Sequence, residues 1–404
     1  MYDVLIAGAG ASGMAAAISA ARENPDLRVC IIERKDTPGK KLAATGNGHC
    51  NATNVKCEHY KETIEFFKSL GVLLKSDSDG RFYPYSGRAD AVIHALYREL
   101  RTLGVKVVFN HCVVDVLPER EGFGIVVTDK QEDTLLHAKK VLVAIGGKAG
   151  PQYGTTGDGS KIAEKLGHRI VKVTPALTAL ECEGPFEELK GVRAAARAKL
   201  LKDGKEISGG EGEVQFNNYG LSGICILDLS RDVIIESGKG DMKEQFRHYA
   251  VSLDLVKDYS EEELTEIIHS NIRIPAATAG DILNSIVTDQ LADYVLASCN
   301  VHAGGYVADI PGLDEKKEKE LAHFLKNMTF TITGAQGWKY AQCTRGGVDL
   351  RDIDKKTMQS KKVPGVYFSG EVTDYDGPCG GFNLQYAWET GIKAGKAIAK
   401  SLEK

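Results

Sequence analysis

The feature that most constrains the fold is a glycine pattern close to the N-terminus. An apolar run of strand type, Val4–Ala7, is followed by glycines in G-x-G-x-x-G spacing and by an alanine-rich stretch of high helix propensity, Met14–Arg22. A second apolar run, LRVCIIE, ends at Glu33, about 20 residues beyond the last of these glycines. Strand, glycine turn, helix and acidic-tipped second strand together predict a Rossmann-like βαβ unit that binds a dinucleotide.

Each defining position of this pattern, the three glycines and the acidic residue, has a definite structural role. Gly8 allows the tight turn from strand to helix, Gly10 lets the backbone approach a pyrophosphate, and Gly13 lets the helix pack close to the strand. The free N–H groups and the positive dipole end of the helix then face the phosphates. Glu33 can accept hydrogen bonds from ribose hydroxyls, but the basic Arg34 beside it leaves NAD, NADP and FAD all open at this point.

The segment GKKLAATGNGHCNATN, residues 39–54, favours FAD. It is too glycine-rich for a helix interior and too polar for a buried strand, and a long segment of this kind is uncommon unless it is functional. A nicotinamide dehydrogenase would usually continue into another crossover helix, whereas FAD enzymes place such a segment along the pyrophosphate, ribityl chain and flavin ring. The candidate contacts are Lys40 or Lys41 for the diphosphate, and Gly46, Asn47, Gly48, Asn51 and Asn54 for the rest.

Composition narrows the class of protein further. The formal net charge is −4, with 51 basic and 55 acidic residues. This balance gives no overall electrostatic attraction to nucleic acid, although it allows a local basic groove. An uninterrupted apolar run long enough to span a membrane is absent, as is a basic region before the first apolar run. The nine cysteines include no C-x-x-C pair, which indicates reduced thiols in a cytoplasmic protein and no metal site.

The pattern along the chain predicts a discontinuous α/β domain. Helices are expected at 60–71 and 89–103, with apolar faces on Ile64, Phe67 and Leu70 and on Val92, Leu96 and Leu100. A meander of strands follows, then a strand over 140–144 ending at the pair Gly146 and Gly147. Thr155 and Thr156 are expected to cap the next helix, with contact to a ligand as the alternative.

The middle of the chain has a different character. Residues 173–344 alternate as strands and then become helical, so they predict an inserted β-rich domain with a small helical part. The charge run DEKKEKE within it is expected to be the solvated face of a helix. The last residues return to the first domain, so that 1–172 and 345–404 form one unit. The C-terminal part, 345–404, is expected to contain a buried strand, GVYFSGE, and a long helix. This helix starts at Gly380–Gly381, and the positive end of its dipole is expected to face a ligand.

Three stretches together resemble a known bacterial flavoprotein family. They are GKKLAATGNGHCNATN, GGVDL with TMQSK, and GVYFSGEVTDYDGPCGGFNLQYAWETG, and the resemblance extends over the whole chain. The family includes 3-dehydro-bile-acid Δ4,6-reductase and aminoacetone oxidase, and it also resembles a ribosomal-RNA dihydrouridine synthase. It usually has arginine where this chain has His49. The resemblance implies FAD contacts at Gly8, Gly10, Ala11, Ser12, Gly13, Glu33, Arg34, Lys40, Lys41, Asn47, Gly48, Val113, Gly146, Glu371, Gly381, Asn383 and Leu384.

The function expected from these features is flavin-dependent reduction of a C=C bond conjugated to a ketone in a steroid-like small molecule. A single dinucleotide fingerprint leaves the electron donor open, with NAD(P)H docking transiently at the flavin as the expected route. Two alternatives stay open: an oxidase that acts on a small amine with oxygen, and a flavoenzyme that reduces uridine in ribosomal RNA. The acidic balance weighs against RNA, because phosphate binding needs clustered basic residues.

Candidate proton donors lie near the expected flavin-facing helix start and in the glycine-rich segment. They are Tyr375, Asp376, Cys379 and His49. The segment FNNYGLSG, residues 216–223, is glycine-bounded and aromatic, so Tyr219 is the candidate for the substrate-facing wall.

Overall fold

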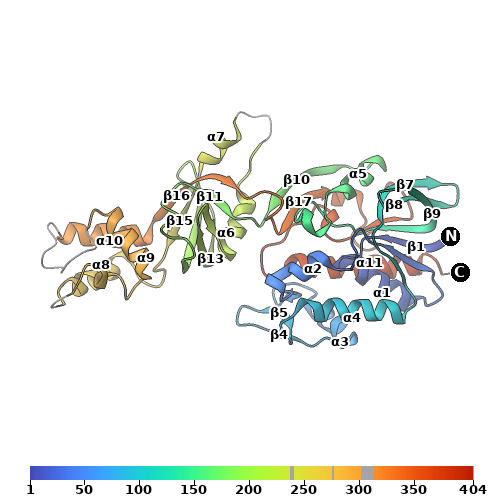
Figure 1. Ribbon diagram of the computed structural model, residues 1–404, viewed down its shortest axis with the longest axis horizontal. Coiled ribbons are helices and arrows are strands. Elements are labelled where there is room, and N and C mark those ends of the chain that lie inside the picture. The colour runs from blue at the N-terminus through green and yellow to red at the C-terminus, as the bar shows by residue number, and fades with distance from the viewer. Residues whose placement is uncertain (237–240, 275–276, 302–312, 404) are drawn as a thin grey trace. The chain divides into compact units, whose positions relative to one another are not determined.

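The computed structural model describes residues 1–236, 241–274, 277–301 and 313–403, and it divides into two compact units (Figure 1). Unit 1 consists of Met1–Ala176 and Trp338–Lys404, and unit 2 consists of Leu177–Gly337. The boundaries differ from those expected at 172 and 345, because strands β10 (Ile170–Ala176) and β17 (Cys343–Val348) pair with each other within unit 1.

The core of unit 1 is a seven-stranded sheet. Its strands are β1 (Tyr2–Ala7), β2 (Val29–Ile32), β6 (Lys106–Val108), β7 (Cys112–Glu119), β8 (Gly122–Thr128), β9 (Asp133–Val143) and β18 (Val366–Phe368). The order is β6-β2-β1-β9-β8-β7, and β18 pairs with β9. β1 is parallel to both its neighbours, and its residues Val4–Ala7 are fully buried, as expected for a strand covered on both faces. The Rossmann-like sheet predicted from the sequence is confirmed.

Strand β9 belongs to two arrangements at once. Its first half pairs with β8 in the antiparallel meander β7-β8-β9, and its second half, Val141–Val143, pairs in parallel with β18. The strand returning from the C-terminal part of the sequence therefore lies next to the carboxyl half of β9. Loops from both ends of the chain thus leave the sheet at one edge.

Two helices from opposite ends of the sequence, α1 (Ala11–Glu23) and α11 (Phe382–Lys400), pack directly together. A Cβ added to Gly391 of α11 would lie 2.3 Å from the carbonyl oxygen of Ser12, and one on Gly395 would lie 2.2 Å from that of Ala16. Only glycine lets these helix backbones approach so closely. The two positions are four residues apart, so both face α1.

The helices expected at 60–71 and 89–103 form as α3 (Tyr60–Ser69) and α4 (Ala89–Thr102). All the apolar side chains expected to be internal are buried except Ile64, which is half-buried. A small antiparallel sheet in the order β3-β5-β4, which the sequence did not predict, is formed by one strand before α3 and two strands between α3 and α4 in the sequence. Its strands are β3 (Thr53–Asn54), β5 (Arg81–Pro84) and β4 (Leu74–Ser76).

Unit 2 is a closed six-stranded barrel with helices in the connections between its later strands. The barrel order is β11-β14-β13-β12-β15-β16, with β11 (Leu180–Cys182), β12 (Arg193–Lys202), β13 (Lys205–Asn217), β14 (Gly220–Ser222), β15 (Tyr249–Asp254) and β16 (Met328–Ala335). The described helices are α6 (Ile224–Leu229), α7 (Met242–Arg247), α8 (Glu261–Ile272), α9 (Asp289–Ser298) and α10 (Glu315–Lys326). Barrel and helices share one apolar core, in line with the predicted β-rich insertion with a helical part.

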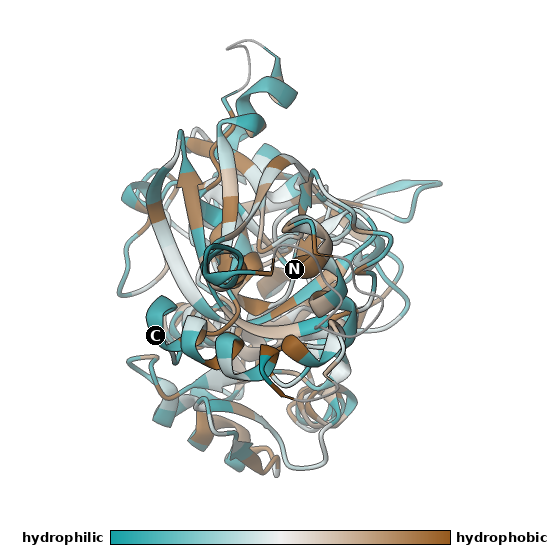
Figure 2. Cartoon of the chain, turned by 90° about the vertical axis from the view of Figure 1, so that its left-hand side faces the viewer, coloured by the Kyte–Doolittle hydropathy of each residue, from teal (hydrophilic) through white to brown (hydrophobic). Residues whose placement is uncertain are grey.

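The charge run DEKKEKE lies at the start of α10, where most of its side chains are exposed, as predicted. Glu318 is the exception, because it is 5% exposed and accepts a hydrogen bond of 2.9 Å from His269 Nδ1 of α8. Figure 2 colours the chain by the hydropathy of each residue, and its helices carry both hydrophilic and hydrophobic residues. Among the described residues, no helix combines the length and apolar character needed to cross a membrane.

Candidate functional site

The fingerprint turn between β1 and α1 has the geometry that its three glycines predict. Gly8 has a φ of +100°, and a Cβ on Gly13 would lie 2.0 Å from the Gly8 carbonyl oxygen. Gly10 differs, because a Cβ there would meet no atom within 4 Å. The turn therefore needs Gly8 and Gly13 for its own packing, whereas Gly10 borders open space at the start of α1.

Glu33 holds this turn by its carboxylate. Its Oε2 accepts a hydrogen bond of 2.7 Å from the backbone N–H of Ala9, and its Oε1 accepts one of 2.8 Å from that of Lys35. Burial raises the pKa of Glu33, and these hydrogen bonds oppose the shift. Each oxygen has a second lone pair, so the carboxylate can still accept a hydrogen bond from a ligand hydroxyl.

The Arg34 side chain forms hydrogen bonds with residues around the start of α5 (Asp158–Lys165). Its guanidinium donates to Thr156 Oγ1 at 2.8 Å and to Asp158 Oδ2 at 2.5 Å. The predicted capping of this helix by Thr155 and Thr156 is wrong, because Gly157 is the N-cap and no side chain caps it. Thr155 instead donates to the carbonyl oxygen of Ala149 at 2.5 Å, which fixes the loop after β9.

The glycine-rich segment 39–54 begins against the fingerprint turn. The N–H of Gly39 donates to the carbonyl oxygen of Ala9 at 2.9 Å. The segment is less irregular than expected, because it forms a short helix, α2 (Lys40–Ala44), followed by a 3-10 turn, Thr45–Gly48. Asn47 in that turn has a φ of 54°, a left-handed conformation that non-glycine residues rarely adopt. Backbone strain of this kind is concentrated at binding and catalytic sites.

The two lysines of this segment have separate partners. Lys41 Nζ forms an ion pair of 2.6 Å with Glu371 Oε2, whereas the more exposed Lys40 pairs with Asp36 at 3.2 Å. Glu371 Oε1 also accepts a hydrogen bond of 2.9 Å from the N–H of Thr344. Lys41 and Glu371 therefore join the glycine-rich segment to β17 and to the residues after β18.

The segment ends against the start of α11, so two stretches far apart in the sequence meet here. Asn54 Nδ2 donates to the Gly380 carbonyl oxygen at 2.9 Å, and Thr53 Oγ1 donates to Gln385 Oε1 at 2.6 Å. The buried Trp388 donates from Nε1 to the Ala52 carbonyl oxygen at 3.0 Å.

Asn51 occupies the centre of this meeting point. A Cβ on Gly381, the N-cap of α11, would lie 2.8 Å from Asn51 Oδ1, and one on Gly46 would lie 3.3 Å from Asn51 N. The Oδ1 atom is buried and accepts no hydrogen bond from any residue in the described part of the chain. A buried acceptor without a donor is costly, so a ligand donor at this place would satisfy it.

The remaining expected cofactor contacts are distributed around these loops. Val113 is buried in β7, and Leu384 of α11 is half-buried against the core. Gly146 follows β9 with a φ of +76°. The Asn383 side chain is engaged by the preceding loop, because it accepts from the Gly377 N–H at 2.8 Å and donates to the Gly377 carbonyl oxygen at 2.9 Å.

The four candidate proton donors differ in their surroundings. His49 is exposed, and its Nδ1 lies 2.6 Å from the Gly87 carbonyl oxygen. Tyr375 stacks on the Tyr386 ring at 3.9 Å between centroids. Cys379 Sγ lies 3.9 Å from Gln342 Oε1. Asp376 belongs to an acidic group, since burial, Asp349 and Asp376 all raise the pKa of Asp374.

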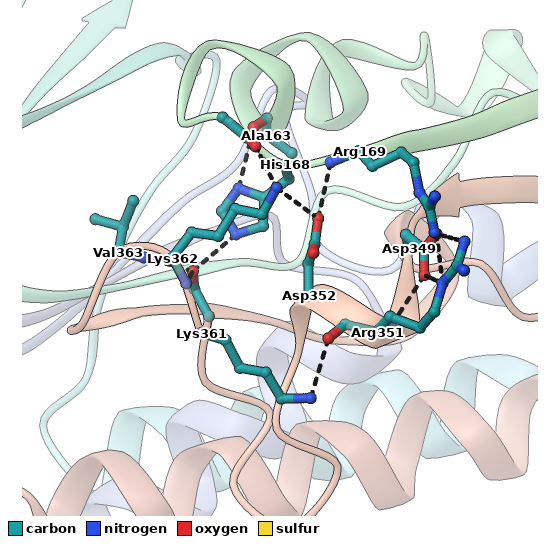
Figure 3. Close-up of polar contacts among 11 residues, drawn as sticks. Ala163, His168, Arg169, Asp349, Arg351, Asp352, Lys361, Lys362 and Val363 are labelled. Atoms are coloured by element: carbon teal, nitrogen blue, oxygen red, sulfur yellow. Dashed lines mark hydrogen bonds and ion pairs between the residues drawn. The ribbon is translucent and has the colours of Figure 1, made fainter.

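Asp349 is held by two guanidinium groups, as Figure 3 shows. Its Oδ2 accepts from Arg169 Nε at 2.7 Å and from Arg351 Nη2 at 2.8 Å. Next to it, the buried His168 lies with Nε2 2.7 Å from Ser360 Oγ. These contacts hold the segment after β17 against the start of β10. They thereby fix the position of Asp349, whose charge acts on Asp374.

Sequence reasoning missed Arg81 and Tyr83 of β5. A Cβ on Gly380 would lie 3.7 Å from Arg81 Cδ, and one on Gly46 would lie 3.7 Å from Tyr83 Cε1. The only signal for them was the short strand pattern RFYP after the turn residues DSDG. Tyr219 lies in unit 2, between β13 and β14, and it is 37% exposed.

The unit 1 loops fit FAD by their own chemistry. The open space at Gly10, the acceptor Glu33 and the unpaired Asn51 Oδ1 lie along one set of loops at the carboxyl edge of a parallel sheet, where nucleotide cofactors bind. No cluster of three or more metal-ligating side chains occurs in the described part of the chain. Fold and site together define a Rossmann-like flavoprotein.

Comparison with known proteins gives the family. Residues 57–397 match the model of the HI0933-like protein Rossmann domain, and residues 3–56 match an FAD binding domain. The chain belongs to the HI0933-like family and is an FAD-dependent oxidoreductase.

Curated relatives match over the full length. The chain is 34% identical to the 3-dehydro-bile acid delta(4,6)-reductase of Clostridium scindens, covering 99% of this chain and 100% of the relative. It is 26% identical to the ribosomal RNA dihydrouridine synthase of Haemophilus influenzae, covering 98% of each. The resemblance to this family that the sequence motifs predict is confirmed.

Solved structures share the fold at low identity. The 3-ketosteroid delta1-dehydrogenase from Sterolibacterium denitrificans has a TM-score of 0.53 at 13% identity, with 99% of both chains covered. A flavocytochrome c3 fumarate reductase has a TM-score of 0.52 at 17% identity, covering 100% of this chain and 79% of that one. At these identities the likeness concerns the fold alone.

Proposed function

We propose that this protein reduces a C=C bond conjugated to a ketone in a steroid-like substrate, with NAD(P)H as electron donor. The observation that carries the proposal is the 34% identity along 99% of the chain to a relative named as a bile-acid delta(4,6)-reductase. FAD supplies the hydride chemistry when it is bound. The fold and the loops described above are compatible with that use.

The chain's own residues would hold the cofactor in a defined way. Gly10 leaves room for the pyrophosphate, and the start of α1 offers it the backbone N–H groups of Ala11 and Ser12. Glu33 would accept from the adenosine ribose, and Asn51 would accept from a donor on the ring. Lys41 is already neutralised by Glu371, so it would orient that carboxylate instead of balancing the diphosphate alone.

The positive end of α11 supports the reduction electrostatically. Its first turn carries no acidic side chain, and its N-cap, Gly381, provides no side-chain hydrogen bond. The free N–H groups there would stabilise negative charge on a reduced ring. We include in the proposal a cytoplasmic location, supported by nine cysteines of which none forms a disulfide in the described part of the chain.

A second function has specific support. The relatives from Haemophilus influenzae and Escherichia coli, at 26% and 25% identity over 98% and 96% of this chain, are named ribosomal RNA dihydrouridine synthases. Reduction of the uracil C5=C6 bond is the same class of reaction, because that bond is also conjugated to a carbonyl. The amine oxidase alternative has support only from the sequence resemblance.

Rapid-mixing kinetics test the proposal. The purified yellow protein is mixed anaerobically with NADH or NADPH, and loss of flavin absorbance is followed, before a 3-oxo-Δ4 steroid is added. We expect one nucleotide to reduce the flavin and the enone to reoxidise it. Reoxidation by ribosomal RNA with formation of dihydrouridine, and none by enones, would favour the second function. Reduction of the flavin by a small amine, followed by its reoxidation by oxygen, would favour the amine oxidase alternative.

A further inference from the structure

Strand β5 presents two side chains to the glycine segments of the site. Arg81 and Tyr83 are two residues apart on the strand, so they lie on the same face. Arg81 lies beside Gly380 and Tyr83 lies beside Gly46, and these glycines belong to the two loops that meet around Asn51. Both side chains therefore border the place where the described loops would hold the flavin ring.

The Tyr83 hydroxyl is available to a ligand. The residue is half-buried, and its hydroxyl makes no hydrogen bond to any residue that the structure describes. Burial raises the pKa of Tyr83, the neighbouring Arg81 charge opposes the shift, and the carboxylates of Asp77 and Asp79 add to it. The phenol therefore keeps its proton at neutral pH and has a cation beside it.

Arg81 is fixed in position by two carboxylates. Its Nε donates to Asp77 Oδ2 at 2.8 Å, and its Nη2 forms an ion pair with Asp79 Oδ2. The Arg81 side chain is 20% exposed. A guanidinium held in this way can stabilise a neighbouring phenolate by opposite charge.

The other candidate donors are less well placed for proton transfer. His49 already contacts a backbone carbonyl oxygen at 2.6 Å, and Tyr375 stacks on the half-buried Tyr386. Tyr83 alone among these candidates combines a hydroxyl without a protein partner, partial burial and a position against the glycine turn.

We propose that Tyr83 is the proton donor for the reduction, an inference that rests on the proposed enone reductase function. When FAD is bound and reduced, it would supply the hydride whose electron pair forms the C–H bond at the β-carbon of the enone. The π electrons of the C=C bond take the Tyr83 hydroxyl proton at the α-carbon. The O–H bond of Tyr83 breaks, its phenolate is left beside Arg81, and water then returns the proton.

The test compares Tyr83→Phe with Tyr85→Phe in the FAD-loaded protein. Tyr85 is a matched control because it is 68% exposed and its ring faces Lys75 Nζ at 5.1 Å. Both variants are reduced with dithionite and mixed with an enone. We expect reoxidation of Tyr83→Phe to slow roughly 100-fold or more, the usual contribution of general acid catalysis, and Tyr85→Phe to match wild type.

Two binding measurements separate this role from a packing role. FAD affinity of the apoprotein is measured by quenching of flavin fluorescence, and binding of the saturated ketone by the shift of the flavin absorbance band. We expect Tyr83→Phe to leave both within about twofold, because the phenyl ring is kept. A parallel loss of FAD affinity and reoxidation rate would make Tyr83 a packing residue and overturn the inference.

The remaining outcomes distinguish the inference from the function beneath it. If wild type reoxidises with the enone and Tyr83→Phe does so at the same rate, the proposed function stands and Tyr83 is not the donor. If the dithionite-reduced wild type is not reoxidised by any enone, the proposed function fails and the role of Tyr83 fails with it.

Discussion

The three glycines of the fingerprint turn, Gly8, Gly10 and Gly13, have different physical roles. Gly13 is required by the protein itself, because any side chain would collide with the Gly8 carbonyl oxygen. Gly10 is required by nothing that the structure describes within 4 Å. A glycine kept at a position with free space is explained by a ligand whose phosphates come close to the backbone.

This difference gives a paired test. Gly10→Val should fold normally, because Gly10 has φ −82° and ψ −171°, an extended conformation that valine adopts readily, but it should bind no FAD. Gly13→Val should lose stability instead, by several kcal/mol from the steric overlap. Thermal unfolding by circular dichroism and the ratio of flavin to protein absorbance measure the two effects. A yellow Gly10→Val protein would contradict the assignment of the pyrophosphate position.

A second single residue, the buried His168, makes the free energy of unfolding depend on pH. Its side chain is 4% exposed, and burial lowers its pKa in the folded protein, against a smaller opposing effect of the Ala163 carbonyl. The unfolded chain has the ordinary value of about 6.5, so below that pH it binds more protons than the folded chain. The stabilisation from neutral His168 is therefore complete above about pH 6.5 and is lost as the pH falls below it.

The corresponding measurement is the urea midpoint at pH 7.5 and at pH 5.5. The drop between the two should be smaller in His168→Gln than in wild type, since glutamine does not titrate. His94 is exposed, so His94→Gln should keep the wild-type drop. An equal drop in all three proteins would assign the acid sensitivity to other groups.

At the scale of elements, the α1–α11 pair joins the two ends of the chain. Helix α11 also carries Gly381 at its N-cap and Trp388 against the glycine-rich segment. Its packing therefore controls where its positive end lies. The structure predicts that loosening this helix pair would affect both stability and cofactor binding.

Gly391→Ala tests that coupling. Alanine normally stabilises a helix interior over glycine by about 1 kcal/mol, but here its Cβ would lie 2.3 Å from the Ser12 carbonyl oxygen. We expect a net loss on the order of 1–3 kcal/mol in urea unfolding, together with weaker FAD binding. The exposed Lys396→Ala on the same helix should change neither. Stabilisation by Gly391→Ala would show that the helices can move apart without cost.

On the scale of the whole molecule, the two units have separate cores. The core of unit 2 consists of barrel and helix residues between Leu180 and Ile332. Unit 2 is also continuous in sequence, whereas unit 1 needs both ends of the chain.

Residues 177–337 produced alone should therefore fold. We expect a single cooperative thermal transition and near-ultraviolet circular dichroism of packed aromatic residues, because Phe186, Phe216 and Phe330 pack together in the barrel core. Residues 1–176 alone should not fold, since they lack β18 and α11. A fragment 177–337 without a cooperative transition would show that its core depends on unit 1.

The sequence by itself determined the nucleotide-binding fold and its glycine turn, because strand, turn and helix there are consecutive and local propensity is sufficient to define them. It also identified the glycine-rich segment and the start of the C-terminal helix as parts of one site. Only the tertiary structure decided which distant residues meet at the site. The hydrogen bond of Asn54 to Gly380, the ion pair of Lys41 with Glu371 and the position of Tyr83 beside Gly46 join residues distant in sequence, and neither periodicity nor spacing encodes such contacts. The same reason explains why Thr155 was misassigned as a helix cap, because its partner, the Ala149 carbonyl oxygen, becomes available only through the fold of the loop.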